Sequence, residues 1–187
     1  MRRGLLGSVT DQIVRSSPVP VLVMSPLAVE RCAQDEHQLH SVVVPLDGSL
    51  MAEAVLPHAE GLAQALSLEV RLLRVVSLGP LAYYGGEGGP VDTSPSDHEL
   101  EEEAAAYLNH VAAAQTSRGL TANCTVARGS TAMAIVDQVK EVRRCLVAIS
   151  THGRAGLGRL LIGSVADTLI RHAGLPVLVV TSRGGDT

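Results

Sequence analysis

The stretch ISTHGRAGLGRLLIGSV, residues 149–165, is the part of the chain that decides the fold. It follows the apolar run CLVAI (145–149), which is typical of a strand buried on both faces. After the glycine-rich residues 150–161, Gly163-Ser164-Val165 opens a segment with helical spacing that continues to His172. A strand, a small-residue loop and a helix start in this order let a phosphate approach unpaired backbone amides at the positive end of a helix dipole.

The helix and strand that follow this loop occur twice in the chain. Residues 3–25 (RGLLGSVTDQIVRSSPVPVLVMS) and 159–181 (RLLIGSVADTLIRHAGLPVLVVT) align without a gap at an offset of 156. We therefore interpret residues 1–25 as the last helix and strand of a preceding copy of one domain. Residues 26–39 are expected to be a polar linker without a core pattern, 40–182 the complete domain and 183–187 a tail.

The complete domain alternates strand patterns with helix patterns. Strands are expected at 41–46, 68–76, 120–128, 145–149 and 177–180, and helices at 50–66, 97–118, 130–141 and 162–172. This order predicts an α/β fold with an open five-stranded parallel sheet and helices on both faces. Residues 77–96, rich in Gly, Pro and Ser, are expected to form a mobile loop. The strand at 20–24 is too apolar to stay bare, so we expect it to pair antiparallel with 176–180 of its own chain or of a neighbour.

The composition excludes several classes of function. The net charge is −4 and Lys140 is the single lysine, so nothing favours nucleic acid or an anionic membrane as a partner. The three cysteines lack C-x-x-C spacing and the seven histidines lack metal-ligand spacing, so we expect no zinc site and no other metal site of their making. We find no signal-peptide pattern and no apolar run of about 20 residues, and we therefore expect a cytoplasmic protein.

The stretch 149–165 resembles the ATP-binding motif G-x2-G-x9-G-[ST] of the universal stress protein family. Here the pattern is Ser150-x2-Gly153-x9-Gly163-Ser164, and THGR and GSV match typical wording of the family. The resemblance covers about residues 40–182 as a full domain and 1–25 as the end of another copy. One departure is that Ser150 stands where the family has its first glycine. A Cβ there would crowd the ligand if the position needed a positive φ or the closest backbone approach.

The resemblance implies a site for ATP, with or without Mg²⁺, at the carboxyl ends of the parallel strands. Asp47 would contact adenine or ribose, Val75 would pack on the base, and the residues from His152 onward would hold ribose and phosphates. The alternative for Asp47 is a structural cap of the following helix, and for His152 a loop histidine held by the backbone. The implied site consists of Pro45, Asp47, Val75, Ile149, Ser150, His152, Gly153, Gly163, Ser164 and Val165.

The function expected from this resemblance is an ATP-binding universal stress protein that acts as a nucleotide-dependent regulatory module. The alternative is a family member without nucleotide, working as a dimerisation or protein-interaction module; Ser150 favours it. An enzyme is not expected, because there is no G-x4-G-K-[ST] loop and no G-x-S-x-G elbow, although slow ATP hydrolysis stays open. The expected partners are a second copy, in a homodimer or higher homo-oligomer paired through last strands, and an unidentified protein.

Overall fold

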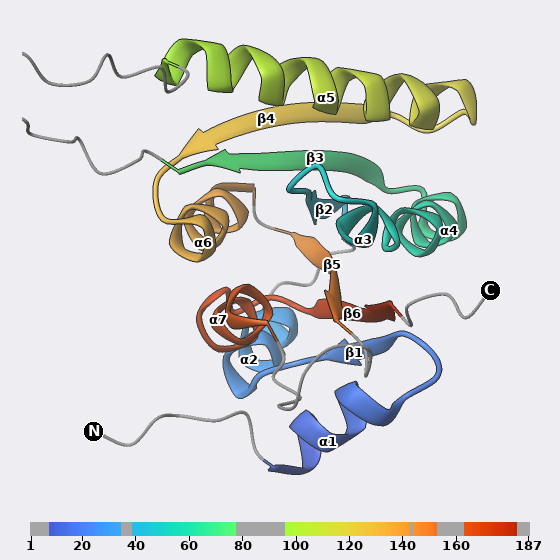
Figure 1. The fold of residues 1–187 in the computed structure, drawn as a ribbon. Coiled ribbons are helices and arrows are strands. Elements are labelled where there is room, and N and C mark those ends of the chain that lie inside the picture. The colour runs from blue at the N-terminus through green and yellow to red at the C-terminus, as the bar shows by residue number, and fades with distance from the viewer. Residues whose placement is uncertain (1–7, 35–38, 78–95, 143, 153–162, 183–187) are drawn as a thin grey trace, which may run out of the picture.

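The computed structural model describes residues 8–34, 39–77, 96–142, 144–152 and 163–182. Strands and helices alternate along this part of the chain, and the strands form one sheet in the middle of the molecule (Figure 1). The expected mobile loop at 77–96 lies almost wholly outside the described residues, as do the expected tail and Gly153.

The sheet has six strands in the order β1-β6-β5-β2-β3-β4. The strands β2 to β6 run parallel to one another, which confirms the expected five-stranded parallel sheet. The sixth strand is β1, which pairs antiparallel with β6 of the same chain and so confirms the predicted docking of this segment. The strands span Val21–Val23 (β1), Ser41–Pro45 (β2), Glu69–Val76 (β3), Ala122–Arg128 (β4), Cys145–His152 (β5) and Val177–Ser182 (β6).

Helices cover both faces of the sheet and bury two apolar clusters (Figure 1). One cluster joins α1 (Ser8–Ser16), α6 (Thr131–Val142) and α7 (Ser164–His172) to the sheet. The other joins α4 (Leu56–Leu66) and α5 (Asp97–Ser117) to the opposite face. Because the inner strands carry apolar side chains toward both clusters, they read as continuous apolar runs in the sequence.

One helix differs from the expectation and another starts where it was expected. The segment expected as one helix over 50–66 is divided into α3 (Leu50–Glu53) and α4, and Pro57, which has no backbone N–H, lies in the first turn of α4. Helix α5 begins at Asp97, as expected, and is capped by Ser96. Ser96 accepts from the Glu99 amide while the Glu99 carboxylate accepts from the Ser96 amide, which is a capping box.

The expected linker without a core pattern is corrected by the structure, which has a helix there, α2 (Pro26–Gln34). Its start follows a simple rule, since the Ser25 hydroxyl accepts from the Ala28 amide at 3.2 Å and Pro26 occupies the first helical position. Ala28 is fully buried. A short helix that buries one small side chain leaves almost no apolar period in the sequence, and this explains the error.

The internal repeat is also a structural repeat. Helix α1 (Ser8–Ser16) and helix α7 (Ser164–His172) begin and end at equivalent residues, and each has an Asp–Arg ion pair four residues apart. In the strand pair, Leu22 lies opposite Leu178, its own equivalent. The flanking pairs are Val21 with Val179 and Val23 with Val177, so the register is isologous, as across a two-fold axis.

Candidate functional site

A cavity of about 270 Å³ lies at the carboxyl ends of β2, β3 and β5, beside the start of α7. Open α/β sheets bind ligands at this end of their strands. Its apolar walls include Pro45 from β2, Val75 from β3 and Ile149 from β5. The arrangement is suited to a flat apolar group held between strand ends, with polar groups at one side.

Ser150 lies in the wall of this cavity, and its hydroxyl oxygen is buried without a hydrogen-bond partner among the described residues. The residue sits inside β5, paired with Val180 of β6, and its φ is not positive. Serine is therefore accommodated without backbone strain at the position where the motif has glycine. A buried hydroxyl without a partner costs free energy, about 1–3 kcal/mol, which a bound polar group would remove.

The start of α7 forms another part of the wall. Gly163 is its N-cap and carries no side chain to occupy the first-turn amides, and a Cβ built on Gly163 would meet nothing within 4 Å. Ser164 and Val165 follow, one exposed and the other half-buried, and both line the cavity. The first amides of a helix have no partner inside the helix and favour an anion.

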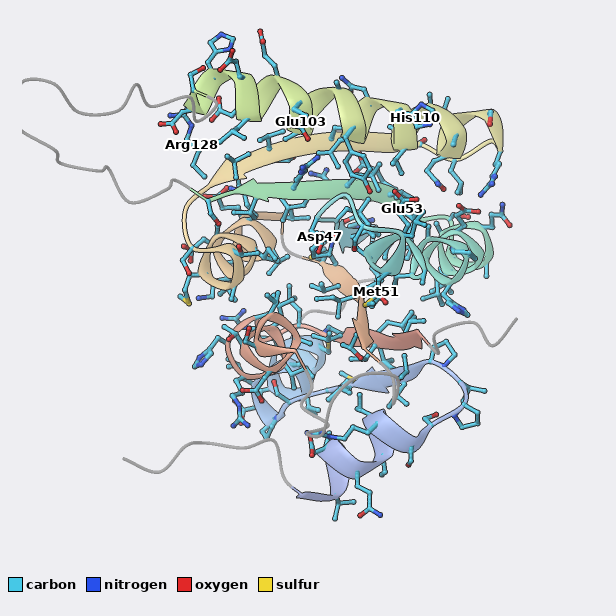
Figure 2. The ribbon with its side chains drawn as sticks, viewed as in Figure 1. Asp47, Met51, Glu53, Glu103, His110 and Arg128 are labelled. Atoms are coloured by element: carbon cyan, nitrogen blue, oxygen red, sulfur yellow. The ribbon has the colours of Figure 1, made fainter. Side chains whose placement is uncertain are left out.

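Asp47 follows β2 and lines the cavity from the side; Figure 2 shows it between β3 and β5. Its Oδ1 accepts from the Ser49 amide at 2.9 Å, and Ser49 in turn caps α3. Partial burial tends to raise the pKa of Asp47, but hydrogen bonds from Ser49 and from its own backbone, together with the Arg74 guanidinium, leave that pKa below its ordinary value. Asp47 is thus ionised at neutral pH. The structural alternative is wrong in one respect, because Ser49 and not Asp47 caps α3. Asp47 instead closes the turn that leads to Ser49, and its place in the wall leaves it available to a ligand.

A second layer of contacts surrounds the Asp47 loop. The Arg74 guanidinium lies over the Tyr107 ring, 5.1 Å from the centroid, and 3.6 Å from a Glu103 carboxylate oxygen. The Tyr107 hydroxyl donates to Glu53 at 2.8 Å. Figure 2 shows Glu53, the last residue of α3, and Glu103 on α5, so this network joins α5 to the wall of the cavity. It helps to fix where the Asp47 carboxylate lies.

The structure brings most of the predicted site together. His152 is the last residue of β5, but its side chain lies outside the described residues, as does the whole of Gly153. Sequence reasoning missed Thr131 and Ile135, which reach the cavity from α6. Thr131 could have been found, because it comes shortly after the parallel strand β4, whose carboxyl end lies at the same edge. The predicted residues in the wall are Pro45, Asp47, Val75, Ile149, Ser150, Gly163, Ser164 and Val165.

Two absences hold for the described part of the chain. Within it, His, Cys, Asp and Glu side chains form no group of three or more that could hold a metal ion. None of its helices is both long enough and apolar enough to cross a membrane.

Comparison with known proteins gives the family. The sequence model of the universal stress protein family matches residues 38–181. A universal stress protein of Methanocaldococcus jannaschii is 31% identical over 145 residues, which cover 78% of this chain and 84% of that protein. One from Mycobacterium tuberculosis (strain ATCC 25618 / H37Rv) is 26% identical over 94% of this chain but only 55% of its own length, so the chain spans about half of that relative.

Solved structures show the same fold. A universal stress protein from Archaeoglobus fulgidus DSM 4304 aligns with a TM-score of 0.66 at 20% identity, covering 95% of this chain and 56% of that one. A universal stress protein in complex with cAMP aligns with a TM-score of 0.58 at 20% identity, covering 79% of this chain and 100% of that one. The chain is a member of the universal stress protein family.

Proposed function

We propose that this chain binds ATP in the cavity at the carboxyl ends of β2, β3 and β5 and acts as a nucleotide-dependent regulatory module. The observation that carries the proposal is the Ser150 hydroxyl, buried without a partner among the described residues in a wall that ends at the start of α7. A ligand that joins an apolar base to hydroxyls and phosphates would satisfy both parts of this wall. The related structure in complex with cAMP supports an adenine nucleotide.

The placement of the nucleotide follows from the chemistry of the wall. The base would lie against Val75 and Ile149, and the ribose hydroxyls would donate to the Asp47 carboxylate. The cavity of about 270 Å³ is small for a whole nucleotide. It would hold the base and ribose, with the phosphates over the amides at the start of α7. Any Mg²⁺ would come with the phosphates and neutralise part of their charge. The proposal assigns no catalytic step to the protein.

The second candidate is a family member without nucleotide, which acts through its surfaces. One observation favours it, namely that Ser150 adds a Cβ and a hydroxyl to a cavity that is already small. The two candidates differ in one measurable property, which is whether ATP binds at all.

The deciding experiment is calorimetric titration of the intact chain with ATP, with and without Mg²⁺. We expect one site, and Asp47→Ala should weaken binding about tenfold, because a hydrogen bond to a charged group contributes about 1.5 kcal/mol. Asp137→Ala is the matched control, since Asp137 is exposed on α6, lies outside the cavity wall and carries the same charge. Equal weakening by both variants would mean that net charge, and not contact, is responsible.

Ser150→Gly separates the two candidates if the intact chain does not bind. Binding of ATP by Ser150→Gly alone would mean that the serine closes the site and would favour the surface-acting candidate. Absence of binding in both proteins would overturn the nucleotide proposal.

Assembly through last strands also stays a proposal. Two chains can pair through β6 only where β1 does not already occupy that edge, as it does here. We propose that β1 takes the place of a second copy's last strand, because the β1–β6 register is the one that two equivalent strands would adopt. The likeness of residues 3–25 to 159–181 supports a tandem origin for this segment.

A further inference from the structure

A second and larger cavity, of about 720 Å³, lies at the opposite end of the sheet. It is lined by residues at the amino ends of the parallel strands, such as Leu39 before β2, Leu146 in β5 and Pro176 before β6. Leu22 of β1 and Met24 just after it complete the apolar wall. The N-terminal strand thus helps to build this cavity, which has no part in the nucleotide site.

Three cations line the same cavity: Arg31 from α2, Lys140 from α6 and Arg144 just before β5. The described part of the chain contains nine arginine and lysine residues. Six of them form ion pairs with carboxylates. The other three are the three cations of this cavity. Arg31 donates to the Ala173 carbonyl at 3.2 Å, and Arg144 Nη1 lies 3.3 Å from His40 Nε2. No acidic side chain is among the described residues of the wall.

The backbone beside two of these cations is constrained. Arg144 has a φ of 40°, which is uncommon for a residue with a Cβ and is retained only where the surroundings impose it. Helix α2 approaches Gly174 so closely that a Cβ there would lie 2.9 Å from Arg31 Nη1 and 2.9 Å from Leu27 Cδ2. Gly174 itself has a φ of 63°, so both its conformation and its contacts require glycine. The cavity therefore has a constrained backbone where Arg31 and Arg144 line it.

We propose that this cavity binds an amphiphilic carboxylate, an unbranched apolar chain with one anionic head, as in a medium-chain fatty acid. Each buried methylene of such a chain contributes about 0.8 kcal/mol against the leucine, methionine and proline wall. The head would be held by cations that have no carboxylate partner among the described residues. A neutral chain would lack this attraction and a cationic chain would be repelled. The volume lies within the usual range for small-molecule sites.

Cys32 provides a local readout, because it is exposed and lines the cavity. Cys145 also lines it but is buried, and burial raises the pKa of its thiol to about 12, so it reacts slowly. The alkylation rate of Cys32 in the intact chain is measured by peptide mass spectrometry. It is compared in decanoate and decyltrimethylammonium below their micelle concentrations and in decanol below its solubility limit. We expect saturable protection of about fivefold or more by decanoate, less by decanol and least by the cation.

Lys140→Gln tests the charged part of the site. Lys140 is exposed on α6, and its loss should raise the half-protecting concentration of decanoate about fivefold. Gln64→Glu is the control, since it changes the net charge by the same amount on an exposed position of α4, away from the cavity. It should leave protection unchanged.

Equal protection of Cys32 by all three compounds, or no protection by decanoate, would overturn the proposal. An equal effect of Lys140→Gln and Gln64→Glu would do the same. Protection by anionic phospholipid vesicles without protection by decanoate would also overturn it, since the surface would then recognise a membrane and not a single chain. None of these outcomes depends on whether ATP binds.

Discussion

Helix α1 with strand β1 and helix α7 with strand β6 are two versions of one sequence unit with different surroundings. The helices have equivalent bounds and the same internal Asp–Arg pair, and each buries a residue at the equivalent position, Val14 and Ile170. Val165, however, lines the nucleotide cavity, whereas its equivalent Val9 is 67% exposed. The repeated unit carries the information for folding and docking, while the site requires the strands β2, β3 and β5 as well.

The largest effect is expected from removing the N-terminal unit, α1 with β1. Deletion of residues 1–30 should uncover the outer edge of β6 and let two chains pair there in the register that β1 now uses. Sedimentation over a range of concentrations should show association that the full chain lacks. In the deleted chain, Leu178→Cys should cross-link to its own copy, because Leu178 lies on the axis of the pairing. An unchanged monodisperse species would contradict the idea that β1 covers an associating edge.

The docking of α1 can be tested by core truncation. Val14 is 1% exposed, so Val14→Ala should lower the free energy of unfolding by about 2 kcal/mol, from lost burial and the cavity left behind. The neighbouring Ile13 is 51% exposed, and Ile13→Ala should cost less than about 0.5 kcal/mol. Urea denaturation gives both values. Equal and small effects would mean that α1 unfolds apart from the domain.

Only the unit of α7 and β6 contributes to the proposed nucleotide site, and this can be tested at two equivalent positions, Val165 and Val9. Val165→Asp would place a carboxylate beside the proposed phosphate position and should weaken ATP binding at least about tenfold by repulsion. Val9→Asp is the control at the equivalent position of the other unit. It should leave the affinity for ATP and the stoichiometry of one ATP per chain unchanged. Calorimetry measures both quantities, and thermal unfolding checks that Val165→Asp is folded. Equal weakening of ATP binding by the two variants would contradict the assignment of the site to the unit of α7.

The smallest expected difference concerns the repeated ion pairs. Asp11 accepts from Arg15 at 2.6 Å and Asp167 from Arg171 at 3.0 Å, both across one helical turn. Asp11→Asn and Asp167→Asn should each cost about 0.5 kcal/mol of unfolding free energy, since such pairs are partly exposed. Thermal unfolding at low and high salt is the measurement. A difference between the two above about 1 kcal/mol would show that the units are supported unequally.

Much of the sheet could be predicted because the inner strands are buried on both faces and leave continuous apolar runs. The docking of β1 was predictable because its sequence matches that of β6, and one edge strand can stand in for another. Helix α2 was not predicted, since only Ala28 is buried completely and its start depends on Ser25 and Pro26. A short helix with capping residues but few regularly spaced apolar residues is easily mistaken for a linker.

The candidate site was partly predictable for a similar reason. Pro45 and Asp47 stand at or just after the end of β2, and Ile149 lies in the last half of β5; parallel strands bring such positions to one edge. The regular strand conformation of Ser150 could not be predicted, because a sequence pattern does not report φ. The larger cavity was also beyond prediction, since its wall combines residues from β1, α2, α6 and β5 that share no motif.

The isologous pairing of Leu22 with Leu178 has a consequence for how the protein behaves as its concentration changes. Strand β1 is joined to the domain by the short stretch between Val23 and Ser41, so it meets β6 at an effective concentration in the millimolar range. A second chain offers the same complementary edge only at its actual concentration, which must approach that value to compete. Below that protein concentration, each chain therefore completes its sheet with its own β1.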